Sequence, residues 1–266
     1  MFVNGAIIAL LFHSSAFWEV HKTRISFDLR GDPVLRSVHY ALIPVGAALI
    51  AAVVTTFWLP GKRLRSYIQH LAAGVVFAAV VAEMFPRLLQ AKLVGATLIG
   101  FVVGVGLFLA IRSLTGKEGN EQSISVSYVA AICADLFVDG WVIGLGFVTG
   151  KNEGKLLTLA LSIELVSLGL ALGSQFIKAG KHPLSVIGYA ALINASLLAG
   201  AGAGAAILPV LSNTASIAVI AFGSAALLYL VTEELLVEAH EEFESPLAAS
   251  LFFAGFLLIF ILDIAN

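Results

Sequence analysis

The sequence predicts an all-α protein that crosses a lipid bilayer many times. Hydrophobic residues make up 59% of the 266 residues and charged residues only 12%, and the mean hydropathy is +0.99. A soluble domain carries about 25% charged residues, so this chain has too little polar surface to cover a water-soluble globule. The apolar runs are also about 20 residues long, which is the length of a membrane-spanning helix rather than of a barrel strand.

Eight strong membrane spans follow one another along the chain. They cover 37–59, 66–89, 93–112, 126–149, 155–177, 184–208, 215–237 and 246–264. Short polar connections with turn residues separate them, such as PGKRLR at 60–65, TGKEGNEQ at 115–122, TGKNEGK at 149–155 and KAGKHP at 178–183. Because no connection is long enough for a soluble module, we expect one transmembrane domain over 1–266 with an eight-helix core at 37–264.

The N-terminal stretch 2–20 is a weaker ninth span. A cleaved signal peptide is the alternative, but no basic residue precedes the apolar run, and His13 and Glu19 lie near its end. A retained helix is therefore the favoured interpretation.

Charge and cysteine content exclude several classes of function. The formal net charge is -2 and there is no basic stripe, so a nucleic-acid partner is not expected. The single cysteine, Cys133, excludes an internal disulfide and a thiolate metal cluster. Lysines and arginines divide almost evenly between the two sides, seven against eight, so charge bias gives no orientation. There is also no glycine loop of the kind that binds ATP phosphates.

Four polar side chains lie near the middle of consecutive spans. Asp135 and Asp139 share one face of the fourth span, Glu164 lies in the fifth and Asn194 in the sixth. An ionised carboxylate at the bilayer centre costs about 2.5–3.5 kcal/mol on insertion scales. No lysine or arginine lies at that depth to neutralise these groups. The pattern therefore favours a bound cation or proton, although an interhelical hydrogen-bonding role stays open, most of all for Asn194.

Small residues on the same spans would let these groups approach one another. Gly140 and Gly144 on the fourth span, and Gly169 and Gly173 on the fifth, form pairs spaced by three residues, which allow close packing of helix backbones. The short connection makes these two spans antiparallel. We therefore expect the three carboxylates to converge on one cavity.

A second set of polar side chains lies nearer the water. The seventh span ends in an acidic run, and a single glutamate closes the second span just before Pro86. The residues that could relay a cation to the mouth are Glu83, Glu233, Glu234, Glu238 and His240. A solvated helix end, with no role in binding, is the alternative for this group.

The spans resemble those of the ZIP (Zrt/Irt-like) divalent metal transporters. The fourth helix of that family carries His-Asn-x-Pro-Glu-Gly, and the same register here reads DLFVDG from Asp135 to Gly140. ELVSLG from Glu164 to Gly169 is similar to the fifth helix. The segments 71–91, 231–240 and 254–266 resemble the second, seventh and last helices in the same order.

The resemblance implies an architecture and an orientation. ZIP-like proteins have eight helices in a 3+2+3 arrangement, with the first three related to the last three by an inverted repeat. The loops after the third and seventh spans would then face the cytoplasm, which would make the acidic end of the seventh span the inner mouth. An extra N-terminal helix also occurs in some bacterial members.

The departures from the family pattern define the expected site. The resemblance makes Asp135, Asp139, Glu164 and Asn194 the ligands of one metal, whereas the ligands of a second metal are replaced by Leu136, Leu165 and Leu168. We therefore expect one bound cation. Relative to an imidazole-containing site, a site with oxygen donors alone favours Mn²⁺, Mg²⁺ or Fe²⁺ over Zn²⁺, although Zn²⁺ can still bind more tightly in absolute terms.

The function that the sequence predicts is transport of a divalent metal, Zn, Mn or Fe, toward the cytoplasm. The metal would be the substrate, and neither an organic cofactor nor enzymatic activity is expected. The protein would be an integral multi-pass protein of the cell (inner) membrane, in contact with lipid, and a homodimer is compatible with this prediction. Two alternatives stay open: a ZIP-like protein whose metal site has decayed into a structural or regulatory role, and an intramembrane metal-dependent hydrolase, which the lack of histidine ligands disfavours.

Overall fold

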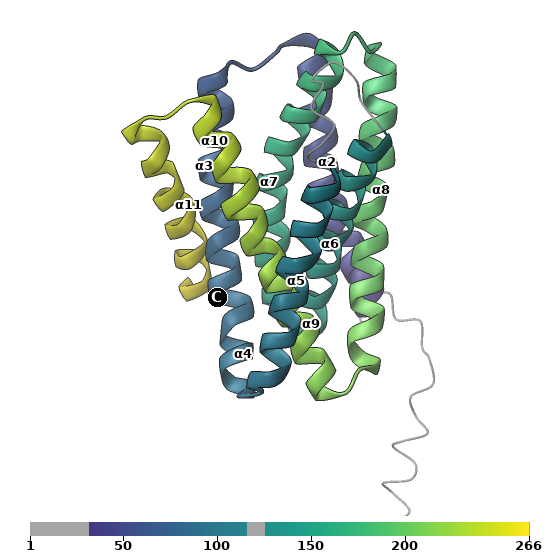
Figure 1. Cartoon of the computed structure of the whole chain (residues 1–266), viewed down its shortest axis with the longest axis vertical. Coiled ribbons are helices and arrows are strands. Elements are labelled where there is room, and N and C mark those ends of the chain that lie inside the picture. The colour runs from purple at the N-terminus through teal and green to yellow at the C-terminus, as the bar shows by residue number, and fades with distance from the viewer. Residues whose placement is uncertain (1–31, 116–125, 266) are drawn as a thin grey trace, which may run out of the picture. The chain divides into compact units, whose positions relative to one another are not determined.

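Long apolar helices account for almost all of the structure (Figure 1). The computed structural model describes residues 32–115 and 126–265, of which 92% are helical with no strand among them. Eight of the described helices are long and apolar enough to cross a membrane. The predicted fold class, an all-α polytopic membrane protein, is confirmed. The predicted helix at 2–20 lies outside the described residues.

The eight spans are built from the following elements. The first five spans are α2 (Pro33–Phe57), the continuous run of α3 (Lys62–Ala79), η1 (Val80–Met84) and α4 (Phe85–Ala91), then α5 (Val94–Thr115), α6 (Val126–Thr149) and α7 (Lys151–Lys178). The last three are α8 (Pro183–Ile207) with η2 (Leu208–Val210), the run of α9 (Asn213–Tyr229), η3 (Leu230–Leu235) and α10 (Leu236–Glu242), and α11 (Pro246–Ala265). Several helices begin or end a few residues outside the apolar runs, because helix continues into the polar flanks.

Glycines decide which helices pack together. A Cβ at Gly140 of α6 would lie 1.9 Å from the carbonyl oxygen of Leu197 on α8, and a Cβ at Gly200 of α8 would lie 2.0 Å from the carbonyl oxygen of Phe137. The two backbones therefore touch directly, which only glycine allows. The predicted close packing at the glycine pairs is confirmed, and α8 is the partner of α6.

The second glycine pair, on α7, packs against α2. A Cβ at Gly169 would lie 2.5 Å from the carbonyl oxygen of Ala48, and one at Gly173 would lie 2.1 Å from Oγ1 of Thr55. Thus α6 and α7, although joined by a one-residue corner, each use their glycines to bind a different outer helix.

The helix pairing has an internal symmetry. Helix α7 packs on α2 as α6 packs on α8, and α11 packs on α3 as α5 packs on α9, while α2 and α8 pack on each other. Exchanging the first three spans with the last three, and α6 with α7, maps this pairing onto itself. The pairing thus has the 3+2+3 form of an inverted repeat.

The second and seventh spans share one further feature. Each is interrupted by a π-helical segment, η1 in the second span and η3 in the seventh. A π segment inserts an extra residue into an α-helix and shifts the register of the side chains that follow it. Glu83 is the fourth residue of η1, and Glu233 is the fourth residue of η3. Both π segments therefore hold a carboxylate.

Candidate cation pathway

The two aspartates of α6 have different surroundings. Asp139 is only 2% exposed, whereas Asp135, one turn earlier, is half-buried and borders a cavity. Gly140, the residue after Asp139, makes the direct contact of α6 with α8. Successive contacts of Gly140 with Leu197 and of Gly144 with Ala201 show that the two helices run in the same direction.

Glu164 reaches a similar depth from α7. Helix α6 ends at Thr149 and α7 begins at Lys151, so the two helices are antiparallel. With a rise of 1.5 Å per residue, Asp139 lies about 15 Å from this corner and Glu164 about 20 Å. Glu164 is 1% exposed, and its carboxylate interacts electrostatically with that of Asp139.

Asn194 supplies a third oxygen from α8. It is 4% exposed, and its Nδ2 donates a hydrogen bond of 2.8 Å to the carbonyl oxygen of Ala190 in its own helix. This bond fixes the amide with Oδ1 pointing away from the helix backbone. Since Asn194 lies one turn before Leu197, it is at the level of the two aspartates on the neighbouring α6.

Three oxygens of this group have no hydrogen-bond partner within the described part of the chain. They are Oδ2 of Asp139, Oε2 of Glu164 and Oδ1 of Asn194, and all three are buried. Buried acceptors are normally hydrogen-bonded, because leaving one unpaired costs about 1–3 kcal/mol. None of the ion pairs among the described residues involves these side chains. A cation could bind all three oxygens, whereas a single proton could pair two of them at most.

The structure does not gather the carboxylates into a three-ligand group. No cluster of three or more His, Cys, Asp or Glu side chains that could hold a metal occurs within residues 32–115 and 126–265. Asp139, Glu164 and Asn194 are each buried, whereas Asp135 borders the cavity. The predicted convergence of all three carboxylates on one cavity is therefore not seen in this conformation.

The cavity that Asp135 borders opens toward the acidic end of the seventh span. It has a volume of about 290 Å³, and its polar walls include Tyr128, Glu234 and Glu238. The carboxylate of Glu234 interacts electrostatically with those of Asp135 and Glu238. A row of acidic groups thus runs from the buried pair to the water at this end of the bundle.

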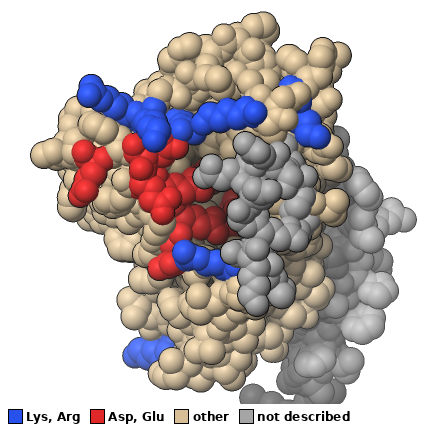
Figure 2. All heavy atoms as spheres, turned by 45° about the horizontal axis from the view of Figure 1, so that its top comes forward, with Lys and Arg blue, Asp and Glu red and all other residues tan. Residues whose placement is uncertain are grey.

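A second cavity of about 380 Å³ lies on the other side of Glu238. Gln69 borders it, and its Nε2 donates a hydrogen bond of 2.8 Å to Oε2 of Glu238. Arg65, also in the wall, forms an ion pair with Glu242. Figure 2 shows these acidic side chains as a patch beside a row of basic ones at the end of the bundle where α3 begins. The sequence did not point to Gln69 or Arg65, because Gln69 lies at the start of a span without a midplane charge and Arg65 lies in the connection before that span.

The remaining predicted residues lie at the edges of this pathway or away from it. Glu233 forms an ion pair with Arg112, in which Oε2 of Glu233 lies 2.5 Å from Nη1 of Arg112. The side chain of Glu233 is 45% exposed and that of Arg112 is 53% exposed. The exposed His240 has its ring 5.0 Å from that of the buried His70. Glu83 is 7% exposed and lies near the opposite end of the bundle, in contact with a different and much smaller cavity.

The three leucines that depart from the ZIP pattern have apolar surroundings or border a cavity. Leu136 and Leu165 are completely buried, and Leu168 borders the 290 Å³ cavity. None of these side chains can bind a cation.

Comparison of the chain with models of protein families and with curated proteins finds no match. The function must therefore be argued from the geometry of the site.

Proposed function

We propose that this protein moves a divalent metal cation across the membrane through the site formed by Asp139, Glu164 and Asn194. The observation that carries the proposal is the set of three buried oxygens, from three different helices, that have no hydrogen-bond partner among the described residues. Groups of this kind inside a membrane protein mark ion or proton pathways, because their burial is otherwise unfavourable.

The cavities support a pathway with one open end. Asp135, Glu234 and Glu238 connect the buried site with the 290 Å³ cavity, whereas the small cavity at Glu83 has about 10 Å³. This is the arrangement of a transporter that opens to one side at a time around a central site. The resemblance to ZIP transporters implies that the open end faces the cytoplasm.

The donor atoms favour a single hard or borderline cation. Two carboxylates and one amide offer oxygen only, and Asp135 can add a further carboxylate when the cation arrives from the cavity. Oxygen ligands suit Mn²⁺ and Fe²⁺, and Zn²⁺ competes for any such site because of its higher general affinity. Leucine at 136, 165 and 168 leaves no donor atom at these positions for a second metal next to the first.

Uptake and binding by the purified protein test the proposal. Proteoliposomes should accumulate Mn²⁺ or Zn²⁺, and calorimetric titration should detect binding, with both signals lost in Asp139→Asn. Glu244→Gln is the control, because it removes one carboxylate charge at an exposed residue outside the proposed site. Absence of binding and of uptake would favour a decayed site. Metal-dependent turnover of lipid or peptide without uptake would favour the hydrolase.

A further inference from the structure

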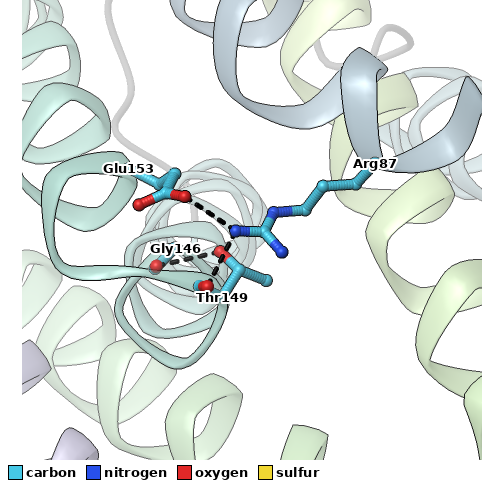
Figure 3. Close-up of polar contacts among 4 residues, drawn as sticks. All are labelled: Arg87, Gly146, Thr149 and Glu153. Atoms are coloured by element: carbon cyan, nitrogen blue, oxygen red, sulfur yellow. Dashed lines mark hydrogen bonds and ion pairs between the residues drawn. The ribbon is translucent and has the colours of Figure 1, made fainter. Parts of the chain in front are cut away.

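At the end of the bundle opposite the acidic cavity, an arginine joins α4 to the ends of α6 and α7. Arg87, on the short helix α4, donates from Nη2 to the carbonyl oxygen of Thr149 at 2.7 Å and to Oε1 of Glu153 at 2.8 Å. Figure 3 shows the guanidinium reaching from α4 to the corner between α6 and α7. The Thr149 carbonyl belongs to the last turn of α6, where no helical N–H is left to bind it. Arg87 therefore joins the second span to both central helices.

The backbone of the corner places Glu153 for this contact. Glu153 lies in the first turn of α7, and its carboxylate folds back over Gly150, the residue between the two helices. A Cβ at position 150 would lie only 2.0 Å from Oε2 of Glu153. The observed position of the carboxylate thus requires glycine at this corner.

The contacts of Arg87 with Thr149 and Glu153 form a clamp, and a second carboxylate lies beside it. Glu83, in η1, is 7% exposed, and its Oε1 is buried without a hydrogen-bond partner among the described residues. With Arg87 and Glu153 it lines a cavity of about 10 Å³, barely the size of one water molecule. Apolar side chains complete the wall: Met84, Leu145, Leu157 and Ile220. A glutamate with an unpaired buried oxygen therefore lines a small, mostly apolar cavity together with Arg87 and Glu153, whose side chains are 33% and 30% exposed.

The two ends of the bundle carry related groups. Under the symmetry of the helix pairing, η1 corresponds to η3 and Glu83 to Glu233. Each of the two π segments places its carboxylate beside a cavity that an arginine also lines, Arg87 at one end and Arg112 at the other. The cavities differ in volume, about 10 Å³ against about 290 Å³. The small cavity is thus the narrow counterpart of the large one.

We propose that Glu83 and Glu153 form a binding site for a divalent cation at the closed end, and that Arg87 occupies it as a tethered counter-ion. An arriving cation competes with Arg87 for Glu153, because the cation and the guanidinium would bind the same carboxylate oxygen, Oε1 of Glu153. Displacement of Arg87 frees α4 from the α6–α7 corner and opens this end. The cation as ligand rests on the proposed transport function, whereas the clamp itself does not.

Thiol labelling in membranes tests this site without measuring transport. In a Cys133→Ala background, a cysteine at Leu145, which is 1% exposed and lines the small cavity, reports opening to a water-soluble thiol reagent. We expect Arg87→Gln to increase the labelling rate about tenfold, because the substitution removes a charge-assisted hydrogen bond that keeps this end narrow. Glu153→Gln and Gly150→Ala should act in the same direction. Arg63→Gln, at the opposite end, should have no effect.

Protection of the Leu145 reporter from labelling by bound Mn²⁺ identifies the ligands of the site. Mn²⁺ should slow labelling of the Leu145 reporter in Arg87→Gln, and the protection should vanish when Glu83→Gln is added. A second reporter at Ile132, in the large cavity, checks that each variant is folded, because its labelling rate should stay unchanged or fall. Unchanged labelling of the Leu145 reporter in all three clamp variants, or protection that survives Glu83→Gln, would overturn the proposal.

The outcome separates this inference from the proposed function. Protection at the Leu145 reporter together with an absence of uptake would overturn transport but keep the site. Normal uptake by the wild type without protection in Arg87→Gln would keep transport and overturn the site.

Discussion

At the level of single residues, the chemistry of the central site depends on which oxygens are already paired. The amide of Asn194 is fixed by its own helix through Ala190, so its oxygen is available to a ligand. Within the described part of the chain, Asp139 and Glu164 each keep one unpaired oxygen, whereas Glu233 is held by Arg112 at the surface. Burial and pairing, rather than residue type, therefore distinguish candidate ligands from groups that only interact with solvent.

Asp135 controls the metal preference if it joins the site. Replacing it by histidine would supply an imidazole nitrogen, which suits Zn²⁺ better than it suits Mn²⁺. We expect Asp135→His to raise the zinc-to-manganese affinity ratio, by about tenfold if one donor changes. Competition titration of the purified variant measures the ratio. Glu244→His, which places the same imidazole at an exposed residue, is the control. An unchanged ratio in Asp135→His would remove Asp135 from the ligand set.

The number of bound metals follows from the leucines. Because Leu136 and Leu165 are fully buried and offer no donor atom, the central site should hold one cation. Anomalous scattering from metal-soaked crystals should give a single peak beside Asp139 and Glu164. Two peaks about 3.5–4 Å apart, the separation of a bridged pair, would contradict this expectation.

At the level of helices, backbone contact positions the ligands. The site needs α6, α7 and α8 at defined rotations, and the contact of α6 with α8 is made by glycines on both helices. Since lipid is as apolar as the helix surfaces, hydrophobicity alone does not choose partners in a membrane, and close packing does. The glycines are therefore part of the site although none of them can bind a cation.

Two glycines of α8 provide a matched test of this contact. A Cβ at Gly200 would lie 2.0 Å from the Phe137 carbonyl oxygen, whereas one at Gly202 would meet only Cγ2 of Val38 at 3.5 Å. Gly200→Ala should separate α8 from α6, lower the unfolding temperature in detergent by several degrees and weaken metal binding. Gly202→Ala should be neutral or stabilising by up to about 1 kcal/mol, because alanine favours helix. Equal thermal shifts would refute the close-contact argument.

At the level of the complete bundle, the inverted pairing of helices sets two ends against each other. The described bundle has a polar, acidic cavity at the end where α3 begins and an almost closed one at the end where α4 lies (Figure 1). In the proposed transport cycle, the two related halves would exchange these states around the central site, which is the basis of alternating access.

Sidedness can be measured directly. If the open end faces the cytoplasm, an impermeant thiol reagent should label a cysteine at Ile132 in inside-out vesicles and not in right-side-out cells, in the Cys133→Ala background. Saturating Mn²⁺ should slow this labelling, because a cation at Asp135 and Glu234 fills the cavity that Ile132 borders. Labelling from the outer side alone would reverse the proposed orientation.

Local patterns in the sequence are enough to give the medium, the number of strong spans and the depth of the midplane groups. Lipid requires about 20 apolar residues per helix, and the 3.6-residue period fixes which residues share a face. The spans at 37–264 and the midplane position of Asp139, Glu164 and Asn194 therefore follow from the amino-acid sequence alone. Their burial agrees with the predicted depth, although their role as metal ligands stays a prediction.

Tertiary packing decides which helices touch, which oxygens stay unpaired and which end is closed. The contacts of the α8 glycines, the half-buried position of Asp135 and the clamp from Arg87 to Glu153 each depend on residues far apart in the chain. Pattern and composition cannot supply such pairings, because apolar helix surfaces in lipid are nearly equivalent until their backbones are fitted together. The physical choice among those fits is made by shape and by the few polar contacts, and both exist only in the folded bundle.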